Sequence, residues 1–145
     1  MTLTIDANTV KQLRDKTGAG FLDCKEALNN NSGNIENAID YLRKKGLAKA
    51  SKKSSREANE GAVGFFENDE ICLLIKVNSE TDFAAKGDTF LDFINKLGKI
   101  LLDLNKLDMS LEDFLKTEIS SKTIKENVDE MIAKIGENIV ISDLR

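Results

Sequence analysis

The chain has 145 residues, of which 41% are hydrophobic and 32% are charged, and its net charge at pH 7 is -4. This length allows one domain with a sizeable core, or a small helical module followed by a modest second domain. No segment approaches the apolar length of a membrane span, and the N-terminus lacks the basic start and apolar run of a signal peptide. We therefore expect a protein of the cytosol, or of the equivalent compartment of an organelle.

Two features of the composition argue against an enzyme or a metal protein. The chain contains no histidine, which removes the commonest general base and a favoured metal ligand. Cys24 and Cys72 lie far apart within helical and strand patterns, without a CxxC spacing, so we expect both to be buried, reduced thiols. We expect no catalytic residue, no metal site and no cofactor. The sequence also lacks a glycine-rich phosphate loop, so we expect no direct binding of a nucleotide.

Charge is distributed unevenly along the chain. Residues 1–57 carry 11 lysines and arginines against 7 acidic residues, whereas residues 58–145 carry 10 against 18. A basic run within the first part could contact RNA phosphates or an acidic protein surface, but such runs are more often solvated helix ends and linkers. No aromatic residue is interleaved to stack on bases, so we do not expect nucleic acid as a partner. The run consists of Arg43, Lys44, Lys45, Lys49, Lys52, Lys53 and Arg56.

The first 45 residues predict three short amphipathic helices. Asp6 can cap a helix over residues 6–17, and a second helix follows over about 21–30. A third helix over 34–45 has apolar residues at i, i+3, i+4 and i+7, and Gly46 is expected to end it. Together the three helices predict a compact helical module.

A change of pattern follows, and it predicts a linker and then a mixed second part. Residues 47–60 become small, basic and polar, which is typical of a linker. Two segments rich in Val, Ile and Phe, separated by Asn68 and Asp69, predict an antiparallel hairpin. The predicted strands are 61–67, 71–78 and 137–141, and the predicted helices are 82 or 86 to 104, 111–116 after a cap at Ser110, and 121–135 before a break at Gly136.

These elements place the chain in the α+β class. We expect a three-helix bundle at residues 1–46, a basic linker at 47–60, and an α+β subdomain at 61–145. In this subdomain a small antiparallel sheet is expected to carry its helices on one face.

The passage from the second strand to the next helix is the most informative segment. Here an apolar strand changes without a spacer into an acidic, aromatic tip that contains Asp82 and Phe83. A large ring beside a carboxylate suits insertion into another protein, because the ring supplies contact area with few rotatable bonds. The alternative is structural: Thr81 or Asp82 is an ordinary helix cap and Phe83 packs into the core.

Two blocks of sequence together resemble translation elongation factor Ts, the nucleotide exchange factor of elongation factor Tu. Residues 10–28 read VKQLRDKTGAGFLDCKEAL, close to the family's N-terminal signature V-K-x-L-R-x-x-T-G-A-G-x-x-D-C-K-x-A-L. Residues 80–86 read ETDFAAK, similar to the family's T-D-F-V-A motif, with Ala84 where valine is usual. Residues 133–139, AKIGENI, look like a third family segment, so the resemblance runs from about residue 4 to residue 142.

For the fold, the resemblance implies a ubiquitin-associated-like three-helix domain followed by the N-terminal half of the family's core. A second core half normally follows, and it would begin near Arg145, so we expect either a fragment or a naturally shortened chain. In the family that second half engages another domain of elongation factor Tu. We therefore expect weaker binding and partial or absent exchange, together with self-association through the open edge of the sheet or through apolar patches.

For the site, the resemblance implies a set of partner-binding residues. We expect Thr81, Asp82 and Phe83 to bind the partner, and Asp82 and Phe83 match the pair that wedges between two helices of the GTP-binding domain of elongation factor Tu. In the family this wedge displaces groups that hold the nucleotide's magnesium ion. Ile135 and Gly136 match a loop that approaches the same domain near its phosphate-binding region. The surface that grips a further helix of that domain corresponds to Lys11, Arg14, Phe21 and Leu22.

Two other functions compete with exchange at this stage. The three-helix part, with Gly18 to Phe21, could form a protein-interaction module that contacts ubiquitin-like or other protein ligands. The basic run could instead belong to a ribosome-associated or RNA-associated protein.

Overall fold

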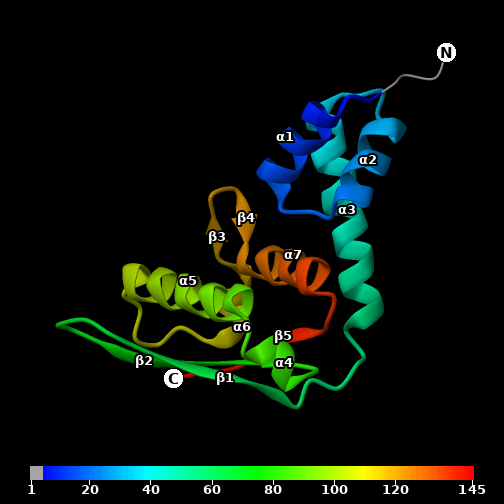
Figure 1. Ribbon diagram of the computed structural model, residues 1–145. Helices are drawn as coiled ribbons and strands as arrows, with labels where there is room; N and C mark the ends of the chain where they lie inside the picture. The colour runs from blue at the N-terminus through cyan, green and yellow to red at the C-terminus, as the bar shows by residue number, and fades with distance from the viewer. Residues whose placement is uncertain (1–4) are drawn as a thin grey trace. The chain divides into compact units, whose positions relative to one another are not determined.

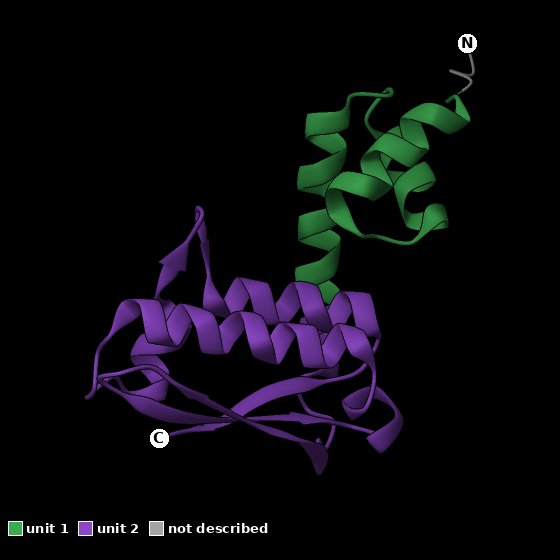
Figure 2. Cartoon of the chain, turned by 60° about the vertical axis from the view of Figure 1, so that its left-hand side comes forward, with its two compact units in different colours: residues 1–49 green, residues 50–145 purple. Residues whose placement is uncertain are grey.

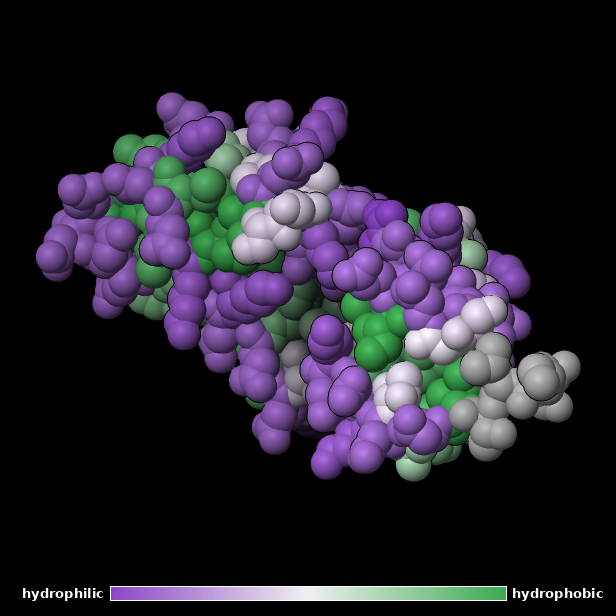
Figure 3. Space-filling view, turned by 90° about the horizontal axis from the view of Figure 1, so that it is seen from above, coloured by the Kyte–Doolittle hydropathy of each residue, from purple (hydrophilic) through white to green (hydrophobic). Residues whose placement is uncertain are grey.

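The computed structural model describes residues 5–145, and these form two compact units that meet between residues 49 and 50 along the chain (Figure 2). Each unit has a hydrophobic core of its own and is described separately. None of the helices among residues 5–145 combines the length and the apolar character needed to cross a membrane. The face seen in Figure 3 is covered mainly by hydrophilic side chains, with smaller apolar areas between them.

The first unit contains the three predicted helices, α1 (Ala7–Thr17), α2 (Phe21–Asn30) and the start of α3 (Ile35–Lys53). Asp6 caps α1 by accepting a hydrogen bond of 2.8 Å from the Thr9 backbone N–H. Gly18 ends α1 in the left-handed conformation, with φ at 66°, which glycine adopts without a steric penalty. The core consists of Val10, Leu13, Cys24, Ala27, Leu28 and Ala38.

The end of the third helix differs from the prediction, because α3 continues to Lys53 rather than stopping at Gly46. Gly46 lies buried within the helix, and the residues after it are mostly good helix formers. Ala50 is 3% exposed and packs in the core of the second unit, so burial compensates for the cost of one glycine. The segment between α3 and the first strand is therefore 54–59, and the predicted linker at 47–60 is too long by its first seven residues and its last one.

The second unit is built on a three-stranded antiparallel sheet, which confirms the predicted hairpin, the third strand and the α+β class. Its strands are β1 (Glu60–Glu67), β2 (Cys72–Ser79) and β5 (Ile139–Leu144), in the order β1-β2-β5. Phe65 pairs with Leu74 across the hairpin. The hairpin turn is closed by the Asn68 side chain, whose Oδ1 accepts hydrogen bonds from the N–H groups of Glu70 and Ile71.

Cys72 corrects one sequence-based expectation. Cys24 is buried as predicted, but Cys72 is exposed at the first position of β2. Its side chain lies on the side of the sheet opposite Leu73, Ile75 and Val77, which alternate with it along the strand and are buried. The prediction failed because an apolar neighbourhood in sequence does not identify the inward face of a strand at its first residue.

The remaining helices lie mostly over one face of the sheet, as Figures 1 and 2 show for α5 and α7. The predicted helix from 82 or 86 to 104 is two helices, α4 (Asp82–Ala85) and α5 (Asp88–Leu104), because Gly87 adopts an extended conformation between them. The helix predicted over 121–135 is α7 (Ile124–Ile135), since residues 118–123 form a small hairpin instead. Its strands are β3 (Glu118–Ile119) and β4 (Lys122–Thr123), and α6 (Leu111–Lys116) precedes it.

Close contact between α5 and the sheet is made possible by two glycines. Gly64 of β1 and Gly98 of α5 both face the ring of Phe66. A Cβ atom added at Gly98 would lie 2.3 Å from Cε2 of that ring, far inside van der Waals contact. The aromatic ring therefore occupies space that any larger residue at position 98 would need.

Substitution Gly98→Ala should destabilise the chain by about 1–3 kcal/mol, because overpacking outweighs the gain in helix propensity. The free energy of unfolding in urea, followed by circular dichroism, measures the effect. Lys99→Ala, at the exposed neighbouring position, is the control and should change stability by less than about 0.5 kcal/mol. An increase in stability for Gly98→Ala would contradict this packing.

Candidate partner-binding site

The tip after β2 carries the most exposed aromatic side chain of the described residues. Phe83 is 86% exposed on the four-residue helix α4, whereas Ala85 on the same helix is 6% exposed and packs in the core. The alternative in which Phe83 packs inside is therefore wrong. The capping part of that alternative is correct, since Thr81 Oγ1 accepts a hydrogen bond of 3.2 Å from the Ala84 N–H.

A single negative charge stands beside this ring. Asp82 is 64% exposed and its carboxylate lies 2.9 Å from Nζ of Lys86, one helical turn further on. The hydrogen bond and charge of Lys86 lower the pKa of Asp82 below its ordinary value, so Asp82 is ionised at neutral pH. The pair is too exposed to stabilise the fold substantially, but it keeps an anion and a cation next to Phe83.

The loop after α7 lies against the same tip. Gly136 ends α7 with φ at 86°, and Ile135 before it is half-buried. The carboxylate of Glu137 accepts two hydrogen bonds from Thr81, one from the backbone N–H at 3.0 Å and one from Oγ1 at 2.7 Å. The structure thus brings together the two segments that sequence analysis singled out separately, residues 81–83 and 135–136.

Sequence reasoning missed Glu137 and Asn138 as members of this site. Asn138 is 3% exposed, and its N–H donates to Oε1 of Glu80 at 2.7 Å. The available signal was the segment AKIGENI, in which polar residues directly follow the glycine that ends a helix. That pattern does not indicate that these polar side chains contact residues 80 and 81.

The other predicted residues form a separate surface on the first unit. Lys11 and Arg14 are exposed on α1, and Phe21 and Leu22 begin α2 with exposed fractions of 50% and 78%. Gly20 precedes them as the cap of α2 without any side chain that could cover the two apolar residues. Both of the adjacent apolar side chains therefore face solvent, where only one was required by helical geometry. Exposed apolar and forked cationic groups of this kind are typical of protein interfaces.

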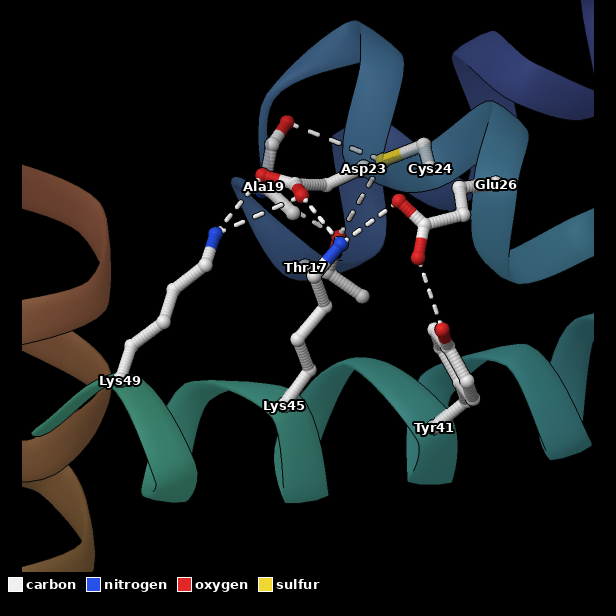
Figure 4. A network of polar contacts seen from close by, with 8 residues as sticks. All are labelled: Thr17, Ala19, Asp23, Cys24, Glu26, Tyr41, Lys45 and Lys49. Atoms are coloured by element: carbon white, nitrogen blue, oxygen red, sulfur yellow. Dashed lines mark hydrogen bonds and ion pairs between the residues drawn. The ribbon is translucent and has the colours of Figure 1, made fainter. Parts of the chain in front are cut away.

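An ionic network attaches α2 to α3 in the first unit (Figure 4). Nζ of Lys45 lies 2.8 Å from Asp23 and 2.7 Å from Glu26, while Lys49 lies 3.2 Å from Asp23. Tyr41 donates its hydroxyl to Glu26 at 2.8 Å. Hydrogen bonding to these partners lowers the pKa values of Asp23 and Glu26 and raises the pKa of Lys45. The network fixes the helix that presents Phe21 and Leu22.

At least five members of the basic run make contacts within the chain, and one of them, Arg43, lies 3.9 Å from Asp40. Lys45 and Lys49 belong to the ionic network just described. Lys53 donates to the carbonyl of Gly136, and Arg56 lies 3.6 Å from Glu80. These contacts commit much of the positive charge to intramolecular partners. Within residues 5–145, no group of three or more acidic or cysteine side chains is arranged to hold a metal ion.

Comparison with known proteins matches this chain to one family. The family described as Elongation factor TS matches residues 80–145, which include the tip, α7 and the loop after it. Elongation factor Ts of Brucella anthropi is 44% identical over 137 residues, that of Spiroplasma citri 44% over 139 residues, and that of Methylobacterium sp. (strain 4-46) 47% over 137 residues. The alignments cover 94%, 96% and 94% of this chain but 44%, 46% and 44% of those proteins, so the chain spans less than half the length of these relatives.

The ionic network predicts a loss of stability in acid. The folded-state pKa values of Asp23 and Glu26 lie below their ordinary values of 3.8 and 4.5, so their contribution is complete above about pH 5 and disappears as the pH falls through the folded values. Lys45→Met removes that contribution, and its thermal midpoint should lie below the parent's at pH 7. The two midpoints should converge toward pH 3, as measured by circular dichroism, whereas a difference that stays constant with pH would contradict this assignment.

Proposed function

Because this chain belongs to the elongation factor Ts family, we propose that it binds elongation factor Tu in the cytoplasm and promotes the release of GDP. The observation that carries this proposal is Phe83, 86% exposed beside an ionised carboxylate on a capped turn. An exposed aromatic ring beside a charge suits contact with a partner, because it supplies a large contact area with few rotatable bonds. The family match includes this tip, since it begins at residue 80.

In the proposed mechanism Phe83 inserts between two helices of the GTP-binding domain and forces them apart. Mg²⁺ requires nearly octahedral coordination, so a small displacement of the groups around it weakens its hold and leaves the diphosphate charge less compensated. Asp82 supplies an anion next to the ring, and Ile135 and Gly136 approach the same domain near the phosphates. No covalent bond forms or breaks, and the chain acts through binding alone.

The first unit contributes an additional contact in this proposal. Residues 1–46 form a ubiquitin-associated-like binding module, and residues 61–145 form the first half of a core that carries the wedge. Lys11, Arg14, Phe21 and Leu22 grip a further helix of the GTP-binding domain, where Phe21 and Leu22 supply apolar anchors and Arg14 a forked donor. This surface adds affinity without taking part in the displacement of Mg²⁺.

Phe83→Ala should lower the rate of GDP release at least tenfold at a saturating concentration of the chain, because the wedge is removed. The release of fluorescent GDP from elongation factor Tu measures this rate. Leu107→Ala is the matched control, since Leu107 is 79% exposed but lies outside the tip. Both variants should keep the parent's stability within about 0.5 kcal/mol. Equal release rates for Phe83→Ala and Leu107→Ala would refute the wedge.

We also propose that two copies of the chain associate through the side of the sheet opposite α5. Val63 is 59%, Phe65 58% and Leu74 42% exposed there, which leaves an apolar strip across β1 and β2. Glu67 lies on β1 at one end of the strip. Lys76 lies on β2 at the other end, where it pairs with Val63. A two-fold axis that crosses the strands at the Phe65–Leu74 pair would place Glu67 of each copy over Val63 of the other, next to the Lys76 that pairs with Val63, so the surface is complementary to itself.

Sedimentation velocity at micromolar concentrations tests this association. The parent should sediment as a dimer, and Phe65→Ser as a monomer, whereas Leu91→Ser on the exposed side of α5 should remain dimeric. Glu67→Lys should weaken the dimer, and adding Lys76→Glu to it should restore the dimer. A monomeric parent, or a double variant that stays monomeric, would contradict the proposal.

A further inference from the structure

The ring of Phe83 cannot be held in place by its own packing. It is 86% exposed, and the helix that carries it has four residues, too few to be stable by itself. Ala85 is the buried residue of α4 and supplies one small apolar anchor. Polar contacts at the start of α4 therefore add to this anchor in setting the direction of the ring.

Those contacts are hydrogen bonds that residues 80–81, before α4, and residues 137–138, after α7, make with each other. Glu137, after α7, accepts from the N–H and the hydroxyl of Thr81 at 3.0 and 2.7 Å. Glu80, before α4, accepts from the N–H of Asn138 at 2.7 Å. Each segment thus contributes one carboxylate that binds a backbone N–H of the other segment. Hydrogen bonds to an ionised acceptor are among the stronger ones in proteins.

These hydrogen bonds continue the pairing of β2 and β5 beyond the last regular pair of residues in the sheet. β2 and β5 end with Ser79 opposite Ile139, and the next residues outward are Glu80 and Asn138. Ser79 is fully buried, and its hydroxyl donates to the carbonyl of Thr81 at 2.9 Å. The side-chain NH2 group of Asn138 donates to the backbone carbonyl of Arg56 at 2.7 Å. Beyond the last paired residues of β2 and β5, the two carboxylates therefore take the place of backbone acceptors. Their hydrogen bonds connect the start of α4 to the loop after Gly136.

We propose that Glu137 is a positioning residue that holds α4, and with it Phe83, in the conformation that enters the partner. The inference rests on the proposed function and adds a residue that does not itself form the wedge. The hydroxyl of Thr81 donates to Glu137 and accepts from the Ala84 N–H, so the carboxylate also fixes the cap of α4. Glu80 supports the same arrangement from the other segment.

Glu137→Gln tests this role with almost no change in side-chain volume. An amide has one oxygen that can accept from the Thr81 N–H, and its NH2 group can only donate to the Thr81 hydroxyl, so the hydrogen bond that this hydroxyl donates to a carboxylate is lost and the remaining contacts are weaker. When the competent conformation is only partly populated, the apparent affinity falls by that fraction, while the bound complex is unchanged. The concentration of chain that gives half-maximal GDP release should therefore rise roughly tenfold, and the plateau rate should stay within about twofold of the parent's. Phe83→Ala, in contrast, lowers the plateau.

Hydrogen exchange of the chain alone gives a readout that does not depend on elongation factor Tu. The N–H groups of Thr81 and Ala84 should exchange roughly tenfold faster in Glu137→Gln, whereas those in the middle of α5 should keep the parent's rates. Thr81→Ser retains the hydroxyl, so the N–H groups of residues 81 and 84 should exchange at the parent's rates in this variant. Glu112→Gln on α6, an exposed glutamate paired with Lys116, is the control for the charge change.

Unchanged exchange of Thr81 and Ala84 in Glu137→Gln would overturn the inference, as would an unchanged half-maximal concentration. Faster exchange throughout α5 would also overturn it, because the residue would then stabilise the whole fold rather than the tip. If the parent itself fails to accelerate GDP release, the proposed function is wrong, and hydrogen exchange still decides whether Glu137 holds α4.

Discussion

The burial of one side of β2 against α5 is the constraint on which the second unit depends. Ile75 and Val77 are fully buried there, and β2 is the central strand, paired with β1 on one side and β5 on the other. Helix α5 contributes Phe90, Ile94 and Leu97 to the same core. Since hydrophobic burial is the main favourable term in folding, the position of every loop at the end of β2 follows from this contact. The tip that carries Phe83 is one of those loops.

Elements with a strong local pattern were predictable from sequence. The cap at Asp6 and the hairpin that turns at Asn68 and Asp69 are each specified by residues a few positions apart, and the structure confirms them. The length of α3 was not predictable in this way. Its extension past Gly46 depends on Ala50, whose burial is a tertiary contact that no local window contains. The break at Gly87 is similar, because glycine permits both a helix and a turn.

In the candidate site, too, the locally specified features were predictable from sequence and the tertiary contacts were not. An aromatic residue beside a carboxylate at the end of a strand indicated the tip, and the exposure of Phe83 agrees with that reading. The partner of Thr81 could not be found from sequence, because Glu137 lies 56 positions further along the chain. Two carboxylates that exchange backbone hydrogen bonds have no signature in spacing or composition. Only the register of β5 against β2 brings them together.

The ionic network in the first unit has a consequence for spectroscopy. The chain has one tyrosine and no tryptophan, so the ultraviolet emission excited near the aromatic band comes from Tyr41 alone. Its hydroxyl donates to Glu26 within residues 1–49, and an ionised acceptor close to a phenol quenches its fluorescence. A change in tyrosine emission therefore reports on the first unit, whereas the seven phenylalanines contribute almost nothing at those wavelengths. Tyr41 is thus an intrinsic fluorescent probe in one of the two units.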